Sequence, residues 1–202
     1  MLLVTHFDPF GQDTMNSSQE VLRNLPDEIL HDVVVKEIPT SKVDVEFLIP
    51  KLLLEIRPDA VLALGQAEGR TVPSLEWIGV NLVHSRMPDN RGQQHQATPI
   101  VPGGPDAYFT SLPILRLHKT VQDRTLPIAL SSTAGLFMCN QAFYLLRHHA
   151  PHIPAGFLHL PYLPQQVVQK PQVPSMALEL QVCITTVILQ DIKDWLAEVT
   201  RQ

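Results

Sequence analysis

One of the two cysteines in this chain lies where a catalytic nucleophile is usually placed. Cys139 follows an apolar run and the small, turn-prone segment "SSTAG", and the residues after it have helical spacing. Unpaired N–H groups and the helix dipole favour an anion at a helix start, so we expect this thiol to ionise readily and act as a nucleophile. Gly135 and neighbouring backbone N–H groups are candidates for an oxyanion hole. The alternative is a small buried hydrophobic residue, the usual role of a free cysteine and the one we predict for Cys183 on the last helix.

A cysteine nucleophile needs a base, and histidine is the usual one. Among nine histidines, His159 ends the apolar run "GFLHL", which predicts a strand with a loop after it. A lone histidine in such a strand can also be a satisfied core residue. His148, His149 and His152 resemble a metal cluster by composition, but they close a predicted helix, where histidines favour the dipole. We predict no metal site there.

Two glutamates compete for the role of orienting the histidine. Glu76 precedes the apolar stretch "WIGVNL", whereas Glu68 lies in the turn "GQAEGR", and composition does not choose between them. The turn lacks the glycine spacing of a dinucleotide-binding or phosphate-binding loop.

Further residues could bind a substrate. Phe7 and Phe10 lie around a proline turn, where they can stack on a flat ligand or simply close the core. Arg86, in "SRMPDN", can face developing negative charge or lie in solvent.

Strands and helices that could position these residues alternate along the chain. Short apolar runs bounded by turn residues predict strands at Leu2–Thr5, Asp32–Ile38, Ala60–Leu64, Trp77–Val83, Leu126–Leu130 and Ala155–Leu160. Helical spacing predicts helices after "MNSS", over Val43–Ile56, from about Cys139 to His149, and from Ser175 onward.

Two of these helices carry local signals that can be checked. At the first, a capping box of Ser17 and Glu20 competes with Asn16 as the cap. In the second, Pro50 is expected to break the helix or to begin a new one.

The alternation of apolar strands with helices predicts an α/β fold with a mostly parallel sheet covered on both faces. Ligands bind at the carboxyl ends of such strands, so the loops after Thr5, Leu64, Leu130 and Leu160 are the candidates. The polar segment 84–112 is long enough to predict a binding loop or disorder. No linker divides the chain, so we predict a single domain over residues 1–202.

Composition excludes several classes of function. The net charge is −5 and no basic block is present, so we predict no nucleic-acid partner. No run approaches the roughly 18 consecutive apolar residues that a membrane helix needs, and the first ten residues lack the features of a secretory signal. Two cysteines do not form a disulfide framework, which favours a cytoplasmic protein.

Eight segments together resemble the type I pyroglutamyl peptidase family, the pyrrolidone-carboxylate cysteine peptidases. They run in family order over most of the chain: "FDPFG" (7–11), "MNSS" (15–18), "RPDAVLALGQAEGR" (57–70), "LEWIGVNL" (75–82), "SRMPDNRG" (85–92), "GPDAYFTSLPI" (104–114), "SSTAGLFMCNQAFY" (131–144) and "GFLHLPYLPQQ" (156–166). The resemblance implies a three-layer α/β/α sandwich with a mostly parallel twisted sheet, similar to phosphorylases and hydrolases.

The resemblance also implies a Cys–His–Glu triad. Cys139 matches the family nucleophile, His159 the histidine, and Glu76 the glutamate, which is then preferred over Glu68. The implied reaction is hydrolysis of the amide bond after an N-terminal pyroglutamyl residue through an acyl-enzyme, with no metal or organic cofactor.

Substrate-binding roles follow from the same resemblance. Phe7 and Phe10 match the aromatic residues that hold the pyrrolidone ring, and Asn16 matches an asparagine near them. Gln66 lies where a backbone carbonyl meets the ring N–H, and Met138 offers backbone contacts.

The oxyanion site and the quaternary structure are implied in the same way. Arg86 matches an arginine placed near the oxyanion, beside the backbone N–H groups near Cys139. The implied partners are peptides with an N-terminal pyroglutamate, and relatives of the bacterial type imply a homodimer or a homotetramer.

The chain departs from the family pattern at a few positions. Glu68 replaces a usual glycine, Trp77 a common arginine, Ser132 a frequent asparagine and Leu136 a usual threonine, while all three implied triad residues are present. Two other functions remain as alternatives: a nucleoside phosphorylase or hydrolase, and an inactive relative that binds pyroglutamyl peptides.

Overall fold

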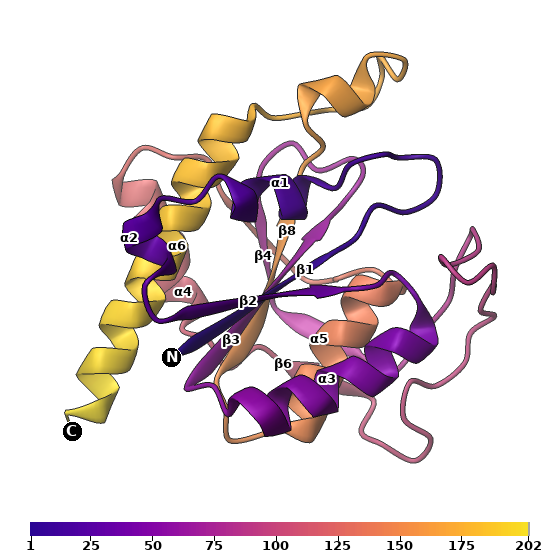
Figure 1. Ribbon diagram of the computed structural model, residues 1–202, viewed down its shortest axis with the longest axis horizontal. Coiled ribbons are helices and arrows are strands. Elements are labelled where there is room, and N and C mark those ends of the chain that lie inside the picture. Colours follow the sequence, from indigo (N-terminus) through magenta and orange to yellow (C-terminus); the bar gives the residue numbers. More distant parts are fainter. Residues whose placement is uncertain (202) are drawn as a thin grey trace.

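A six-stranded sheet forms the centre of the molecule (Figure 1) in the order β2-β1-β3-β8-β4-β7. This computed structural model describes residues 1–201. The strands are β1 (Leu2–Phe7), β2 (Val33–Ile38), β3 (Ala60–Gln66), β4 (Ser74–Glu76), β7 (Ala129–Ser131) and β8 (Ala155–Leu160). The first four in sheet order pair in parallel, and β4 runs antiparallel to β8 and parallel to β7. The prediction of a mostly parallel sheet is confirmed.

Helices cover both faces of the sheet, which makes three layers (Figure 1). One face carries α1 (Ser17–Arg23), α2 (Asp27–Leu30), α4 (Ile114–Asp123) and α6 (Leu178–Thr200). The other carries α3 (Lys42–Ile56), α5 (Met138–His149) and a small ribbon of β5 (Ile78–Val80) and β6 (Ala107–Phe109). A short 3₁₀ helix, η1 (Pro164–Val167), follows β8. The predicted α/β/α sandwich is therefore confirmed.

Alternation along the strands divides the core into two clusters. Leu62 and Leu158 belong to the cluster under α6, whereas Ala63 and Phe157 belong to the cluster under α3 and α5. Successive side chains of a strand point to opposite faces, so the next residues on the α5 side are Gly65 and His159. The alternation along β8 therefore points His159 toward α5, the helix that carries Cys139.

Two local predictions about helices are corrected by the structure. Asn16 caps α1, because its side chain accepts the Ser18 N–H, so the rival capping box of Ser17 and Glu20 is wrong. Pro50 lies inside one continuous helix, α3, and breaks nothing. The loss of one helical hydrogen bond at proline is offset by packing of the buried face around Ile49.

Other differences concern strands and the last helix. The predicted strand Trp77–Val83 is shorter than expected: β5 covers only Ile78–Val80 and pairs with β6, outside the central sheet. Trp77, between β4 and β5, packs against the cluster under α6. Cys183 is exposed rather than buried, because the buried stripe of α6 passes through neighbouring positions such as Ile184 and Val187. The helices α2 and α4 were not predicted, and segment 84–112 contains β6.

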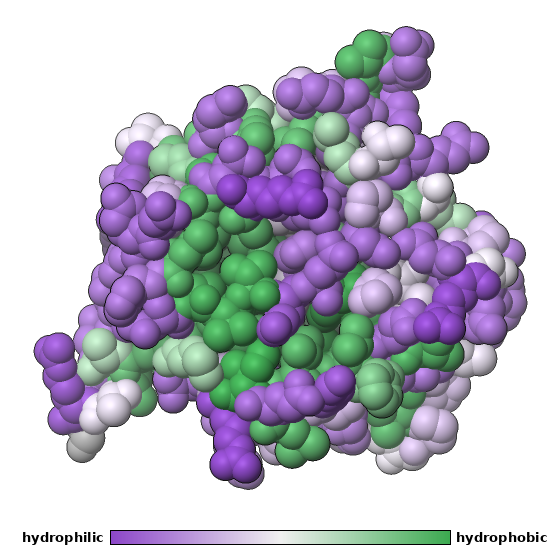
Figure 2. Space-filling model, in the orientation of Figure 1, coloured by the Kyte–Doolittle hydropathy of each residue, from purple (hydrophilic) through white to green (hydrophobic). Residues whose placement is uncertain are grey.

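Hydrophobic side chains also reach the surface near β2, the edge strand of the sheet (Figure 2). Val33, Val34 and Val35 are only partly buried there. Within the part of the chain that the structure describes, no helix is both long enough and apolar enough to cross a membrane.

Candidate active site

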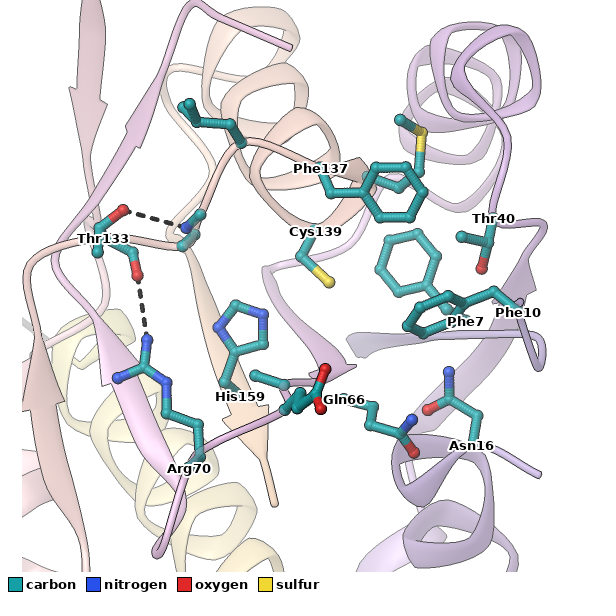
Figure 3. Close-up of a pocket in the computed structure, with 16 residues that line it drawn as sticks. Phe7, Phe10, Asn16, Thr40, Gln66, Arg70, Thr133, Phe137, Cys139 and His159 are labelled. Carbon is teal, nitrogen blue, oxygen red and sulfur yellow. Dashed lines mark hydrogen bonds between the residues drawn. The ribbon is translucent and has the colours of Figure 1, made fainter. Parts of the chain in front are cut away.

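A cavity of about 280 Å³ opens at the carboxyl ends of β1 and β3, beside the start of α5 (Figure 3). Residues after β1, β3 and β7 line it, and His159 enters it from β8. The sequence indicated the loops that follow these strands as candidates for ligand binding. Residues 133–137, after β7, line the cavity although β7 runs opposite to β8.

His159 and Glu76 form a buried pair beneath the cavity. His159 Nδ1 lies 2.7 Å from Glu76 Oε1, and the side chains are 4% and 0% exposed. In the antiparallel register Glu76 lies opposite Phe157, so its side chain reaches diagonally to the histidine two residues further along. A carboxylate only accepts hydrogen bonds, so we assign the proton to Nδ1, which leaves the Nε2 lone pair available.

Glu76, and not Glu68, is thus the glutamate that the structure brings to His159. Glu68 lies in the loop after β3, where it lines the same cavity but is exposed. Among the described residues it forms no ion pair.

The thiol of Cys139 points into the cavity beside the His159 ring (Figure 3). Cys139 is the second residue of α5 and lies directly over Gly65 of β3. A Cβ at Gly65 would come within 2.6 Å of Cys139 Sγ and 2.8 Å of the Phe157 ring. The absence of a side chain at this strand position therefore makes room for the sulfur.

Backbone N–H groups at the start of α5 have no partner within the helix. The first N–H bonded within the helix is that of Gln141, which donates to Phe137 O. The helix itself therefore leaves the N–H groups of Met138, Cys139 and Asn140 without partners. Gly135, by contrast, already donates its N–H to Thr133 Oγ1 at 3.1 Å. This N–H is therefore not free for an oxyanion hole, contrary to the expectation from the sequence.

The electrostatics of the thiol differ from what the helix start predicted. Burial, and secondly the negative charge of Glu76, raise the pKa of Cys139 to about 12. The expected lowering is therefore wrong for the resting site, because desolvation and a nearby carboxylate outweigh the helix N-terminus. Cys139 is a neutral thiol at pH 7, and its proton must leave as the new bond forms.

The other side of the cavity is apolar and aromatic. Phe7, Phe10 and Phe137 gather there with Asn16 (Figure 3), and the rings of Phe10 and Phe137 lie 6.0 Å apart between centroids. Asn16 donates its side-chain N–H to Asp8 O at 3.0 Å. The sequence reasoning singled out Phe7, Phe10 and Asn16 but missed Phe137, which caps α5.

Gln66 and Met138 also line this cavity. The side-chain oxygen of Gln66 is occupied, since it accepts from the Ser17 N–H at 2.8 Å and from Gln166 Nε2 at 2.7 Å. This leaves the backbone of Gln66 for a ligand. Thr40, held by a hydrogen bond from its N–H to Asp8 Oδ1, is a further lining residue without a sequence signal.

Two predicted features lie outside the cavity. Arg86 is exposed and does not line it, so its oxyanion role stays a prediction. His148 contacts Tyr108, with Nδ1 3.0 Å from the phenol oxygen, and stacks on Tyr144. Among residues 1–201, no three His, Cys, Asp or Glu side chains are grouped to hold a metal ion.

Arg70 is the charged residue that the sequence reasoning missed. Its Nη2 donates to Glu76 Oε1 at 2.9 Å, to Ser131 Oγ at 2.9 Å and to Thr133 O at 3.1 Å. In Figure 3 it lies across His159 from the aromatic side. The cavity thus has an apolar end, a polar end and a thiol between them.

A three-layer α/β fold with a thiol facing a glutamate-bound histidine defines the class of cysteine hydrolases. Comparison with known proteins identifies the family. The sequence profile of the pyroglutamyl peptidase family matches residues 1–193. The chain belongs to this family of cysteine peptidases, as the resemblance predicted.

Individual relatives agree with this assignment. The chain is 44% identical to pyrrolidone-carboxylate peptidase 1 of Caldanaerobacter subterraneus over 88% of this chain and 90% of that protein. It is 40% identical to the pyrrolidone-carboxylate peptidase of Thermococcus onnurineus over 94% and 96% of the two chains. A solved mutant pyrrolidone carboxyl peptidase from Pyrococcus furiosus superposes with a TM-score of 0.90 at 34% identity, covering 96% of this chain and 99% of that one.

Proposed function

We propose that this enzyme removes N-terminal pyroglutamyl residues from peptides, with Cys139 as the nucleophile, His159 as the base and Glu76 as the orienting acid. The single observation that supports this assignment is the 2.7 Å contact of Glu76 with His159, which lines the same cavity as the thiol. The pyroglutamyl peptidase activity itself agrees with the family to which the chain belongs.

In the proposed first step, the Cys139 sulfur attacks the carbonyl carbon of the pyroglutamyl residue. Because the thiol is neutral, its proton passes to His159 Nε2 as the carbon–sulfur bond forms. The carboxylate of Glu76 stabilises the imidazolium that results and keeps the ring oriented.

Collapse of the tetrahedral intermediate breaks the carbon–nitrogen bond. His159 gives its proton to the leaving amine, and a thioester to Cys139 remains. A water molecule, deprotonated by His159, then attacks the thioester and releases pyroglutamate with the thiol restored. The N–H of Cys139 is the proposed donor to the oxyanion, together with Arg86 if the loop that carries it approaches the substrate.

The apolar end of the cavity suits a flat, neutral lactam ring. Phe7 and Phe10 offer ring faces, Asn16 and the backbone of Met138 line the wall, and the Gln66 carbonyl is the proposed acceptor for the ring N–H. A site that pairs both polar groups of the lactam disfavours proline, because an unpaired buried polar group costs about 1–3 kcal/mol. Arg70 and Thr133 lie across His159 from the rings (Figure 3), and this is the side proposed for the peptide that follows the lactam.

The test is release of a fluorophore from a pyroglutamyl amide. We expect turnover by the wild type and by Cys183→Ser, a control that changes the exposed cysteine of α6. Cys139→Ser should lose at least about a thousandfold in kcat/KM, as removal of a nucleophile typically does. Full turnover by Cys139→Ser would contradict the proposed triad, and a prolyl amide cleaved equally well would contradict the proposed ring site.

Two further proposals concern the whole protein. We propose that it forms a homodimer or a homotetramer, and light scattering behind size-exclusion chromatography measures this directly. Exposed side chains on α3, such as Phe47 and Leu54, are available for such contacts. We also propose that it acts in the cytoplasm, where a reducing environment keeps both free cysteines as thiols.

A further inference from the structure

Arg70 connects the two halves of the candidate active site through one nitrogen. Its Nη2 contacts the carboxylate that orients the base, 2.9 Å from Glu76 Oε1. The same nitrogen contacts Ser131 Oγ at the end of β7 and Thr133 O in the loop that leads to the nucleophile. Ser131 and Thr133 are tied to each other as well, because Ser131 Oγ donates to Thr133 O at 3.2 Å.

The position of this contact on Glu76 is unusual. Oε1 of Glu76 receives both His159 Nδ1 and Arg70 Nη2, while Oε2 is buried with no hydrogen-bond partner in the part of the chain that the structure describes. The histidine and the arginine therefore share one oxygen of a carboxylate that water does not reach. In such a site the charge of the guanidinium directly affects how strongly the carboxylate attracts a proton onto the imidazole.

We propose that Arg70 is a positioning residue of the reaction, which holds Glu76 against His159, anchors the nucleophile loop, and by its charge opposes the uptake of a proton by the pair. This inference rests on the proposed function, because it acts through His159 and Glu76. Without the cation, the pair of His159 and Glu76 takes up a proton more readily, whichever of the two holds it. Protonation of the pair abolishes the base in either case.

The remaining titratable groups around the pair do not replace Arg70. The other titratable side chains that line the cavity are Cys139 from α5 and Glu68 from the loop after β3. Neither provides a positive charge at neutral pH. Arg70 is 28% exposed at the cavity wall, so a small cation added from solvent can reach its place.

The test compares pH profiles of kcat/KM for Arg70→Met and the wild type. We expect the acid limb to move to higher pH by about one unit, the low end of the effect of a neighbouring opposite charge, because Arg70 is partly exposed. Below the midpoint of the wild-type acid limb, where activity falls tenfold per pH unit, this shift appears as an approximately tenfold loss. In Arg70→Ala, guanidinium ion at non-denaturing concentration should restore part of the activity. An unmoved acid limb would overturn the proposal.

Arg116→Met is the matched control. Arg116 also bridges carboxylates, since it joins α4 to Asp191 and Glu198 of α6, but it lies away from the cavity. We expect its profile to coincide with that of the wild type. An equal displacement of the acid limb in Arg116→Met would show a general charge effect and would overturn the specific role of Arg70.

A second measurement does not depend on turnover. NMR titration of His159 in the Cys139→Ser background should show protonation at higher pH when Arg70 is also changed to Lys or Met, with a smaller displacement for Lys. If Arg70→Met fails to fold, the Lys variant provides the comparison. An identical His159 titration with and without Arg70 would overturn the proposal. Failure of the triad itself would instead appear as full activity of Cys139→Ser with Arg70 intact.

Discussion

At Cys139 two effects of the local environment oppose each other. The start of α5 presents unpaired N–H groups that favour a thiolate, whereas burial and the charge of Glu76 favour the thiol. The second effect is larger, and it raises the pKa of Cys139 to about 12. A raised pKa argues against a preformed thiolate, so in the proposed mechanism His159 accepts the proton during attack.

Alkylation kinetics test this conclusion. Because the pKa of Cys139 is raised, its thiolate fraction at pH 7 is below that of an ordinary cysteine and grows as pH rises toward about 12. Iodoacetamide should therefore modify the exposed Cys183 first at pH 7, and Cys139 should react faster with each step in pH. Peptide mass mapping over pH 6 to 10 measures both sites. Faster labelling of Cys139 than of Cys183 at pH 6 would contradict the neutral thiol.

The candidate acid–base residues could be chosen from the sequence, but the surroundings of the thiol could not. His159 ends an apolar run, and the family resemblance preferred Glu76 over Glu68. The pKa of Cys139 depends on a carboxylate that is distant in the chain and on burial, and neither is visible in a local pattern. Arg70 was missed for the same reason, since its three partners come from other parts of the sequence.

At the scale of elements, Gly65 in β3 sets the position of the nucleophile. The helix start can approach the sheet here because no Cβ stands between Cys139 Sγ and the strand. No sequence signal distinguished this glycine, because the need for it arises from the close contact between the strand and α5. The strand that contains it was predicted well at its start and two residues too short at its end.

The variant Gly65→Ala tests this arrangement. The added methyl would overlap Cys139 Sγ and Phe157, so we expect a loss of about 1–3 kcal/mol in the free energy of unfolding. We also expect a loss of about a hundredfold in kcat, since displacement of a reacting group by about 1 Å has that effect. Urea denaturation and steady-state kinetics measure the two quantities separately.

Gly156→Ala provides the comparison for this variant. Its Cβ would meet Leu112 Cδ1 and Thr110 Oγ1, both at 2.8 Å, in a part of β8 away from the thiol. It should be destabilised to a similar degree and retain its kcat. Equal kcat values for the two folded variants would show that Gly65 serves packing alone.

Element boundaries show where sequence reasoning stops. Ala155–Leu160 was predicted with the bounds that β8 has, because a short apolar run bounded by prolines and loop residues has few other interpretations. The bounds predicted for Trp77–Val83 were too wide, because the chain leaves the central sheet after Glu76 and only a short strand pairs with β6. That choice depends on a distant partner, Ala107–Phe109.

At the scale of the whole molecule, the sheet joins the two hydrophobic clusters. Every strand of the parallel part contributes to one cluster through alternate residues and to the other through the remaining ones. Neither helical layer can separate without exposing its own face of the same sheet. We therefore expect residues 1–202 to behave as the single domain predicted from the sequence.

Equilibrium unfolding in urea tests this expectation. Trp77 and Trp195 both pack against the cluster under α6, so tryptophan fluorescence reports that layer, whereas far-UV circular dichroism reports all helices. We expect one transition with coincident midpoints in the two signals. A fluorescence transition well separated from the circular dichroism transition would indicate that the layers unfold independently.

The proposed reacting groups are divided between layers. The histidine and its glutamate are part of the hydrogen-bonded sheet, while the sulfur is carried by a helix that only rests on it. A small rigid-body displacement of α5 is therefore expected to lower turnover while leaving the secondary structure intact. Substitutions where α5 contacts α3, away from the cavity, are therefore expected to change the rate indirectly.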